Sequence, residues 1–348
     1  MHFLVTGGLG YIGAHTIIQL YEAGHTASII DNCINSEEST IHLLNKIVKQ
    51  HIPYYNVDIT KKDVLMLLQI NKPDFIIHFA ALKNVGDSSK FPFEYYENNL
   101  VGLLNMLEFS KKIDCPNFIF SSSATVYPHN AIKPLTEETP ASASNTSYNS
   151  IITCYSPYGT SKLMCEQILH DISSADDYWN IIILRYFNPV GNHLSSLIGD
   201  NFKELKGGMN LFTAILNKKY NNIPVTIFGN KYPTIDGTAV RDYIHVLDVA
   251  DAHIKSAEQY KDKKGLEVFN IGTGNGYSVL EIINKFNKLE FGIEYKFVDA
   301  RKGDVAELWA DCTKAEHILN WKPSRTLNDM VQSTIQYYLN SIRNEKYI

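Results

Sequence analysis

Tyr158 and Lys162 form the pair whose residue types and spacing could perform chemistry on a hydroxyl group. They lie four positions apart in the run Pro157-Tyr-Gly-Thr-Ser-Lys, which is typical of a helix start with proline in its first turn. This spacing places both side chains on one face of a helix. A tyrosine has an ordinary pKa of about 10, and a nearby ammonium would lower that pKa and favour the phenolate. Such a tyrosine could act as a general base toward an alcohol.

A tyrosine four residues before a lysine is also compatible with an ordinary helix start, so a second feature is needed. The run Phe118 to Tyr127 reads as a buried strand that ends in serines, and Ser123 could bind a substrate hydroxyl opposite Tyr158. Tyr148 and Tyr155 lie nearby, but neither has a lysine at the fourth following position. A serine, a tyrosine and a lysine at strand and helix ends would form a hydride-transfer site if a dinucleotide binds beside them.

Gly7, Gly10 and Gly13 form a GxxGxxG array between the first apolar run and an amphipathic stretch. Glycine permits a tight turn and lets the backbone approach a pyrophosphate. A helix that starts near Tyr11 would direct its amino end at the negative charge, with Ile12 in its first turn. Glycine turns are common in loops, so the array gains weight only from its place between a strand and a helix.

Asp31 ends the second apolar run, eighteen positions after Gly13. A carboxylate at this place can accept hydrogen bonds from ribose hydroxyls and would repel a 2′-phosphate, which favours NAD over NADP. The alternative is that Asp31 only caps the next turn. Asp58 and Ile59 follow the third run and could flank the adenine.

Alternating strands and helices must position these residues. Apolar runs that predict buried strands lie at 2–5, 27–30, 53–57, 74–79, 117–121 and 181–185, with amphipathic stretches at 12–23, 37–50, 61–71 and 93–112 between them. This order predicts an α/β fold with a doubly wound parallel sheet of the Rossmann type. We expect an NAD-binding domain over 1–188, to which 240–265 returns, and a smaller α/β domain that binds the substrate over 189–348, with helix over 313–343.

The composition excludes several other classes of function. The chain has 348 residues and a net charge of −5, which argues against a nucleic-acid partner. Its apolar runs are too short for a membrane span, and its first residues enter a strand, so we expect no signal peptide. Five cysteines without CxxC spacing predict free thiols and a cytoplasmic location. The twelve histidines lack metal-ligand spacing, so no metal is expected.

Together these motifs resemble the extended short-chain dehydrogenase/reductase family, most closely its nucleotide-sugar epimerases. The similarity runs from residue 3 to 311 through LVTGGLGYIGAHT, HFAALKNVGDS, EYYENN, NFIFSSSATVY, SPYGTSKLMCEQIL, LRYFNPVGNH, IFGNKYPTIDGTAVRDYIHVLDVAD and GDVAELWAD. The resemblance implies NAD as cofactor, a UDP-hexose as substrate and inversion at the sugar C4. It also suggests a homodimer through the helices near 93–112 and 158–175.

By this resemblance Tyr158 is the base, Lys162 tunes it and holds the nicotinamide ribose, and Ser123 orients the sugar. Further cofactor contacts would come from Asn32, Asn35, Ser36, Phe79, Ala80, Lys83, Asn98 and Phe187. Lys83 would also face the substrate, whose remaining contacts would be Asn188, Asn210, Leu211, Phe228, Arg241, Arg301, Asp304 and Leu308. The arginine fork suits a diphosphate.

The sequence departs from the family pattern at four places. Pro128 replaces a usual glycine, the loop at 141–156 is extended, and 194–213 lacks the usual proline-rich pattern and double asparagine. Leu308 stands where a tyrosine restricts the pocket to plain hexoses, so its smaller side chain predicts that N-acetylhexosamine nucleotides are accepted too.

Two other functions stay open. A nucleotide-sugar 4,6-dehydratase or decarboxylase could use the same fold, but a dehydratase typically needs acids where this chain has Ala124 and Thr125. A non-catalytic NAD-sensing protein usually lacks the tyrosine or the lysine, and both are present here.

Overall fold

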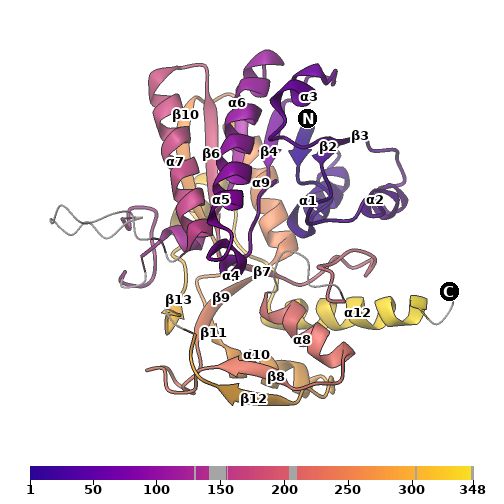
Figure 1. Cartoon of the computed structure of the whole chain (residues 1–348), viewed down its shortest axis with the longest axis vertical. Coiled ribbons are helices and arrows are strands. Elements are labelled where there is room, and N and C mark those ends of the chain that lie inside the picture. The colour runs from indigo at the N-terminus through magenta and orange to yellow at the C-terminus, as the bar shows by residue number, and fades with distance from the viewer. Residues whose placement is uncertain (129–130, 141–153, 155, 204–209, 302–303, 346–348) are drawn as a thin grey trace.

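Seven parallel strands form the central sheet of the protein, in the order β10-β6-β5-β4-β1-β2-β3 (Figure 1). The computed structural model describes residues 1–128, 131–140, 154, 156–203, 210–301 and 304–345. The strands are β1 (His2–Thr6), β2 (Thr26–Asp31), β3 (Tyr54–Asn56), β4 (Phe75–His78), β5 (Asn117–Ser123), β6 (Asn180–Tyr186) and β10 (Gly265–Ile271). The predicted Rossmann-type parallel sheet is therefore confirmed, and its strands are apolar because both faces of the sheet are covered.

Helices cover the two faces of this sheet and create two apolar cores. Successive side chains of β1 point to opposite faces of the sheet, so Phe3 and Val5 lie in one core and Leu4 in the other. The first core contains side chains of α1 (Tyr11–Glu22), α2 (Thr40–Val48) and α9 (Val246–Tyr260). The second contains side chains of α3 (Lys62–Leu67), α6 (Gly102–Lys112) and α7 (Pro157–Ala175). The catalytic candidates on α7 thus belong to the second face.

A π-helical turn, η1 (Glu97–Val101), interrupts the predicted helix over 93–112. It follows the short helices α4 (Val85–Ser88) and α5 (Pro92–Tyr96) and continues directly into α6. Turns of this kind are frequent at functional sites, and this one holds Asn98 and Asn99. A 3-10 turn, η2 (Ala124–Val126), follows β5 in the same region, directly after Ser123.

The second half of the chain builds a smaller lobe below the main sheet in Figure 1. Its strands are β7 (Asn188–Val190), β8 (Val225–Phe228), β9 (Val240–His245), β11 (Gly276–Ser278), β12 (Tyr295–Val298) and β13 (Glu307–Leu308). Strand β9 pairs with β7, β11 and β13, and β8 pairs with β12. The helices α8 (Leu211–Tyr220), α10 (Val279–Lys288) and α12 (Leu327–Glu345) enclose a third core that includes Phe212, Phe286 and Val331.

The chain returns from the smaller lobe to the main sheet before it ends. Helix α9 packs against α1, and β10 pairs in parallel with β6 at the edge of the sheet. Helix α11 (Thr313–Leu319) then contacts α9 and β10. The region over 313–343, which the sequence predicts to be helical, contains α11 and α12. None of the helices in the described part of the chain has the length and apolar character to span a membrane.

Candidate active site

The glycine array forms the turn between β1 and α1, and steric contacts explain two of its glycines. Gly7 has φ +69°, and a Cβ there would lie 2.7 Å from the backbone nitrogen of Ala80. A Cβ at Gly13 would lie 2.3 Å from the Gly7 carbonyl oxygen, so α1 packs directly on the turn. Gly10 caps α1 without a side-chain hydrogen bond to the helix, which leaves the first backbone N–H groups of α1 without a side-chain partner at this cap. Ile12 packs at the border of the first core.

Asp31 ties this turn to the loop after β2. Its carboxylate accepts hydrogen bonds from the Leu9 backbone N–H (3.0 Å), the Cys33 backbone N–H (2.9 Å) and the Ser36 hydroxyl (3.0 Å). The structure therefore contains the turn-capping arrangement that the sequence left open as an alternative. It also places the carboxylate beside the glycine turn, where a ribose contact and the structural contacts are compatible.

The other candidate cofactor residues lie on the loops after β2, β3, β4 and β6, except Asn98, which lies in η1. Asn32 accepts a hydrogen bond from the Ile34 N–H at 3.1 Å, and Asn35 donates to the Ala81 carbonyl at 3.4 Å. Asp58 caps its own loop through Thr60, and Ile59 is buried. Phe79 packs on His253, Ala80 donates to the Thr6 hydroxyl, Asn98 donates to Asn99, and Phe187 is buried beside β10.

The catalytic candidates meet where β5 ends and α7 begins. Ser156 caps α7 through the Gly159 N–H, so Pro157 and Tyr158 occupy its first turn. The Ser123 hydroxyl, at the end of β5, hydrogen-bonds with Tyr158 and accepts from the Thr125 hydroxyl at 3.0 Å. The Lys162 ammonium is buried, donates to the Ser121 carbonyl at 2.6 Å and lies 4.7 Å from the centre of the Phe120 ring. The structure thus brings the three predicted residues together.

The pKa values of Tyr158 and Lys162 are shifted by burial. Burial raises the pKa of Tyr158 to about 12, and the hydrogen bond with Ser123 acts in the opposite direction. Burial also lowers the pKa of Lys162 to about 8. The expected lowering of this pKa required the Lys162 ammonium together with a positively charged nicotinamide, so it stays a prediction for the protein with its cofactor bound; in the protein alone the pKa is raised. Desolvation of the phenol dominates, and the ammonium is held at the Ser121 carbonyl.

The candidate residues for the UDP end lie around β8, β9 and β13 of the smaller lobe. Arg241 pairs with Asp304, and Arg301 stacks on Phe228 with 3.8 Å between the guanidinium carbon and the ring centre. Asn188 donates to the Asp242 carbonyl at 2.8 Å. Leu308 on β13 pairs in register with Arg241 on β9, so the position expected to control sugar size lies beside a candidate phosphate ligand.

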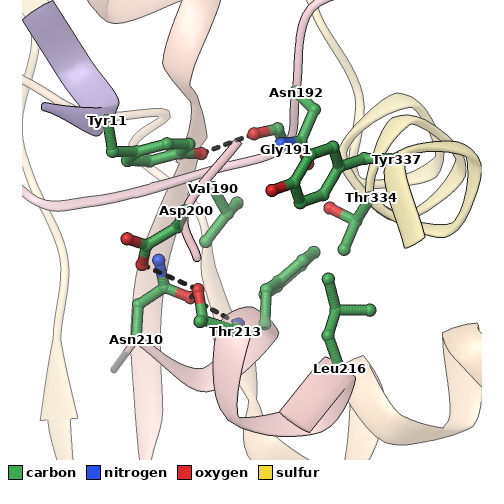
Figure 2. Close-up of a pocket in the computed structure, with 11 residues that line it drawn as sticks. Tyr11, Val190, Gly191, Asn192, Asp200, Asn210, Thr213, Leu216, Thr334 and Tyr337 are labelled. Atoms are coloured by element: carbon green, nitrogen blue, oxygen red, sulfur yellow. Dashed lines mark hydrogen bonds between the residues drawn. The ribbon is translucent and has the colours of Figure 1, made fainter. Parts of the chain in front are cut away.

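Tyr11 and Asn210, expected at the cofactor and at the substrate, line one small pocket (Figure 2). Tyr11 donates to the Gly191 carbonyl, and Asn210 caps α8 by accepting from the Thr213 N–H at 2.9 Å. Leu211 begins α8 at the border of the third core. Asp200 lies in the same pocket, accepts from the Thr213 hydroxyl at 2.8 Å and approaches the Lys83 ammonium at 4.0 Å.

Comparison with known proteins decides the family. The profile of the NAD dependent epimerase/dehydratase family matches residues 3–272. The UDP-glucose 4-epimerase of Yersinia pestis is 43% identical over 336 residues, which are 96% of either chain. The chain belongs to the NAD dependent epimerase/dehydratase family.

Solved structures of this family share the fold. The UDP-glucose 4-epimerase of Bifidobacterium longum in complex with NAD+ and UDP superposes with a TM-score of 0.89 and 40% identity, over 98% of this chain and 99% of that one. The UDP-Glc/GlcNAc 4-epimerase of Campylobacter jejuni superposes with a TM-score of 0.79 and 30% identity, over 97% of this chain and 99% of that one.

The residues around the glycine turn suit the NAD of this family. A Cβ at Gly7 or Gly13 would collide with backbone atoms of the loop after β4 or of the turn itself, so only glycine permits this close packing of the turn. The amino end of α1 presents N–H groups without a side-chain cap, which is the donor set that a pyrophosphate requires. Gly7, Gly10 and Gly13 would hold the pyrophosphate, and Asp31 would bind the ribose. Among the described residues no group of His, Cys, Asp and Glu could hold a metal ion.

Three charged residues near the candidate active site were not predicted from the sequence. Asp200 approaches the Lys83 ammonium. It lies within 194–213, the segment that lacks the proline-rich pattern and the double asparagine of the family. Glu166 and Arg185 form a buried ion pair behind the catalytic helix. Two signals could have found this pair, because Glu166 follows Lys162 by four residues and Arg185 interrupts an apolar strand. Tyr148 and Tyr155 and most of the extended loop lie outside the described residues.

Proposed function

We propose that this protein interconverts UDP-galactose and UDP-glucose by inverting the configuration of the sugar C4 hydroxyl. The observation that carries the proposal is the meeting of Tyr158, Lys162 and Ser123 at the end of β5, beside a glycine turn built for NAD. The relatives named UDP-glucose 4-epimerase cover nearly the whole chain, which supports the same substrate here.

Tyr158 is the general base of the proposed reaction. Its phenolate oxygen takes the proton of the C4 hydroxyl, and the Ser123 hydroxyl holds the sugar oxygen during this transfer. NAD, when bound, supplies a positively charged ring that accepts a hydride from C4 and returns it. The protein alone raises the pKa of Tyr158 to about 12, so the phenolate depends on added positive charge, which that ring would supply. Tyr158 returns the proton after the keto sugar has turned over.

The UDP end must stay bound while the sugar turns over. Arg241 and Arg301 are placed to bind the diphosphate, and Asp304 to accept hydrogen bonds from ribose hydroxyls. Arg241 and Asp304 pair with each other in the structure, so each would exchange a protein partner for a substrate group. Arg241 lies on β9, and Arg301 and Asp304 lie before β13. These elements belong to the smaller lobe, whereas Ser123 ends a strand of the main sheet.

We infer that UDP-N-acetylhexosamines are substrates too, because Leu308 is smaller than the tyrosine that would restrict the sugar pocket to plain hexoses. Leu308 pairs with Arg241 across β13 and β9, and leucine leaves space that tyrosine would fill. The name of the Campylobacter jejuni relative records activity on both a plain and an N-acetylated sugar, within the same fold. Equal failure of both UDP-N-acetylhexosamines where UDP-galactose turns over would contradict this part of the proposal.

We also infer a homodimer in a reducing, cytoplasmic compartment. Large apolar side chains are exposed over the α5–α6 face, among them Phe93 at 74% and Leu104 at 43%, which suits contact with a second copy. All five cysteines carry free thiols. Sedimentation of the wild type and of Phe93→Asp would test the dimer, since a charge on this face should yield monomers.

The test of the activity is incubation with UDP-galactose and analysis of the products. The proposal expects UDP-glucose without net NADH, and loss of turnover in Tyr158→Phe with NAD retained. A 4-keto-6-deoxy sugar nucleotide would indicate a dehydratase, although Ala124 and Thr125 offer no acid for elimination. Retained NAD without turnover of any UDP-sugar would indicate a non-catalytic protein.

A further inference from the structure

A buried ion pair lies behind the catalytic helix. The guanidinium of Arg185 on β6 contacts the carboxylate of Glu166 on α7 through three hydrogen bonds of 2.6, 3.0 and 3.2 Å. Their side chains are 8% and 7% exposed. Buried pairs of this kind add little stability compared with apolar residues of the same volume. Stability therefore does not explain this pair.

The pair is connected to the site through Ser122. The Ser122 hydroxyl donates to the Glu166 carboxylate, and Ser122 directly precedes Ser123 in β5. Glu166 lies one helical turn beyond Lys162, whose ammonium donates to the Ser121 carbonyl at 2.6 Å. Two polar contacts, one turn apart, therefore fix α7 to the last residues of β5.

Arg185 extends the connection away from the helix. It donates to the Tyr127 hydroxyl at 2.9 Å, and that hydroxyl donates to the Asn270 side chain of β10 at 2.6 Å. The Asn270 amide in turn donates to the Leu135 carbonyl at 2.8 Å. A buried network whose polar groups are hydrogen-bonded in this way holds its side chains rigidly in place.

We propose that Ser122, Glu166 and Arg185 are positioning residues that fix the height of α7 along β5. The inference rests on the proposed function, since Tyr158 on this helix must face Ser123 at the end of this strand. Helix α7 has 19 residues and a modest apolar stripe, and sliding by one residue would move Tyr158 by about 1.5 Å. A misplacement of about 1 Å can reduce the rate about a hundredfold.

Ser122→Ala is the test variant, because it removes the contact to the helix and leaves the ion pair intact. Ser110→Ala is the matched control, since Ser110 is also buried and its hydroxyl also makes one buried hydrogen bond, to the Cys115 carbonyl. We expect similar losses of melting temperature in both. In Ser122→Ala the kcat for UDP-galactose should fall tenfold or more at unchanged KM and NAD content, while Ser110→Ala keeps the wild-type kcat.

A second variant removes the pair as a unit. Loss of the Glu166 carboxylate alone leaves the Arg185 charge buried without its partner and could prevent folding, so Glu166→Leu, which also removes the acceptor of the Ser122 hydroxyl, is combined with Arg185→Met. The folded double variant should show the same loss of kcat and retain NAD. Equal kcat in Ser122→Ala and Ser110→Ala, or full kcat in the double variant, would overturn the proposal. An inactive wild type would instead refute the proposed function itself.

Discussion

Replacement of Gly13 by alanine tests the argument that steric contact, and not helix chemistry, dictates this residue. Gly13 lies in the first turn of α1. The added Cβ would lie 2.3 Å from the Gly7 carbonyl oxygen and 2.8 Å from the Gly8 Cα. Both are backbone atoms of the turn expected to hold the cofactor pyrophosphate, so relief of the contact must move that turn or α1.

Two effects of opposite sign determine the result. Alanine in place of glycine within a helix gains roughly 0.5–1 kcal/mol where space permits. Overpacking a rigid site costs roughly 1–3 kcal/mol, and this contact lies about 1 Å inside ordinary van der Waals distance. We therefore expect Gly13→Ala to lose about 1–2 kcal/mol of stability net. With an unfolding entropy of roughly 2.1 cal/mol/K per residue, 1 kcal/mol shifts the melting temperature of a 348-residue chain by about 1.4 °C, so this temperature should fall by about 1–3 °C.

The control is Gly86, a helical glycine in α4 where an added Cβ would meet only the Asn84 side chain at 3.5 Å. Thermal unfolding of both variants, with NAD measured after release from the purified protein, gives the answer. Gly13→Ala should melt lower and retain less NAD, whereas Gly86→Ala should melt at or above the wild-type temperature. A Gly13→Ala protein that melts higher and keeps its NAD would refute the steric argument.

Three further predictions concern the reaction. Because burial lowers the pKa of Lys162 to about 8, its ammonium is lost as the pH rises through that value; kcat for UDP-galactose should fall there, and a kcat that stays constant to pH 10 would contradict it. Leu308→Tyr should abolish turnover of UDP-N-acetylglucosamine and keep that of UDP-galactose, as measured by product chromatography. Arg301→Ala should raise the KM for UDP-galactose about 10- to 100-fold at similar kcat, since it removes contacts made equally before and during reaction; unchanged KM would exclude Arg301 from the diphosphate site.

The sheet and its glycine turn could be predicted because their causes are local in sequence. Apolar runs alternate with amphipathic stretches, and parallel strands buried on both faces leave such runs. The return of β10 to the edge of the sheet was harder to place, because pairing with β6 depends on a chain excursion through the smaller lobe. The π-helical turn at Glu97–Val101 has no sequence signal of its own within a continuous amphipathic stretch.

The candidate site was predictable in its members and less so in its electrostatics. The spacing of Tyr158 and Lys162 correctly indicates one helix face, but spacing carries no information on burial. Both side chains are desolvated in the fold, which raises the pKa of the phenol, and the Lys162 ammonium is bound to the Ser121 carbonyl. The partners of Glu166 were likewise hidden, because Ser122 and Arg185 come from strands that only the folded sheet places behind α7.

For Tyr158 in its proposed role as base, the raised pKa predicts that proton abstraction requires the positive charge of the bound cofactor. With a Tyr158 pKa of about 12, a neutral phenol predominates at physiological pH, and it can donate but not abstract a proton. Each pKa unit corresponds to about 1.4 kcal/mol, so a positive nicotinamide must contribute several kcal/mol to reach neutrality. A spectrophotometric titration of the tyrosine, compared between wild type and Tyr158→Phe, should therefore show a pKa near 12 in protein stripped of NAD and a much lower pKa in the holoenzyme. The same pKa in both forms would mean that the charge on the cofactor does not activate Tyr158.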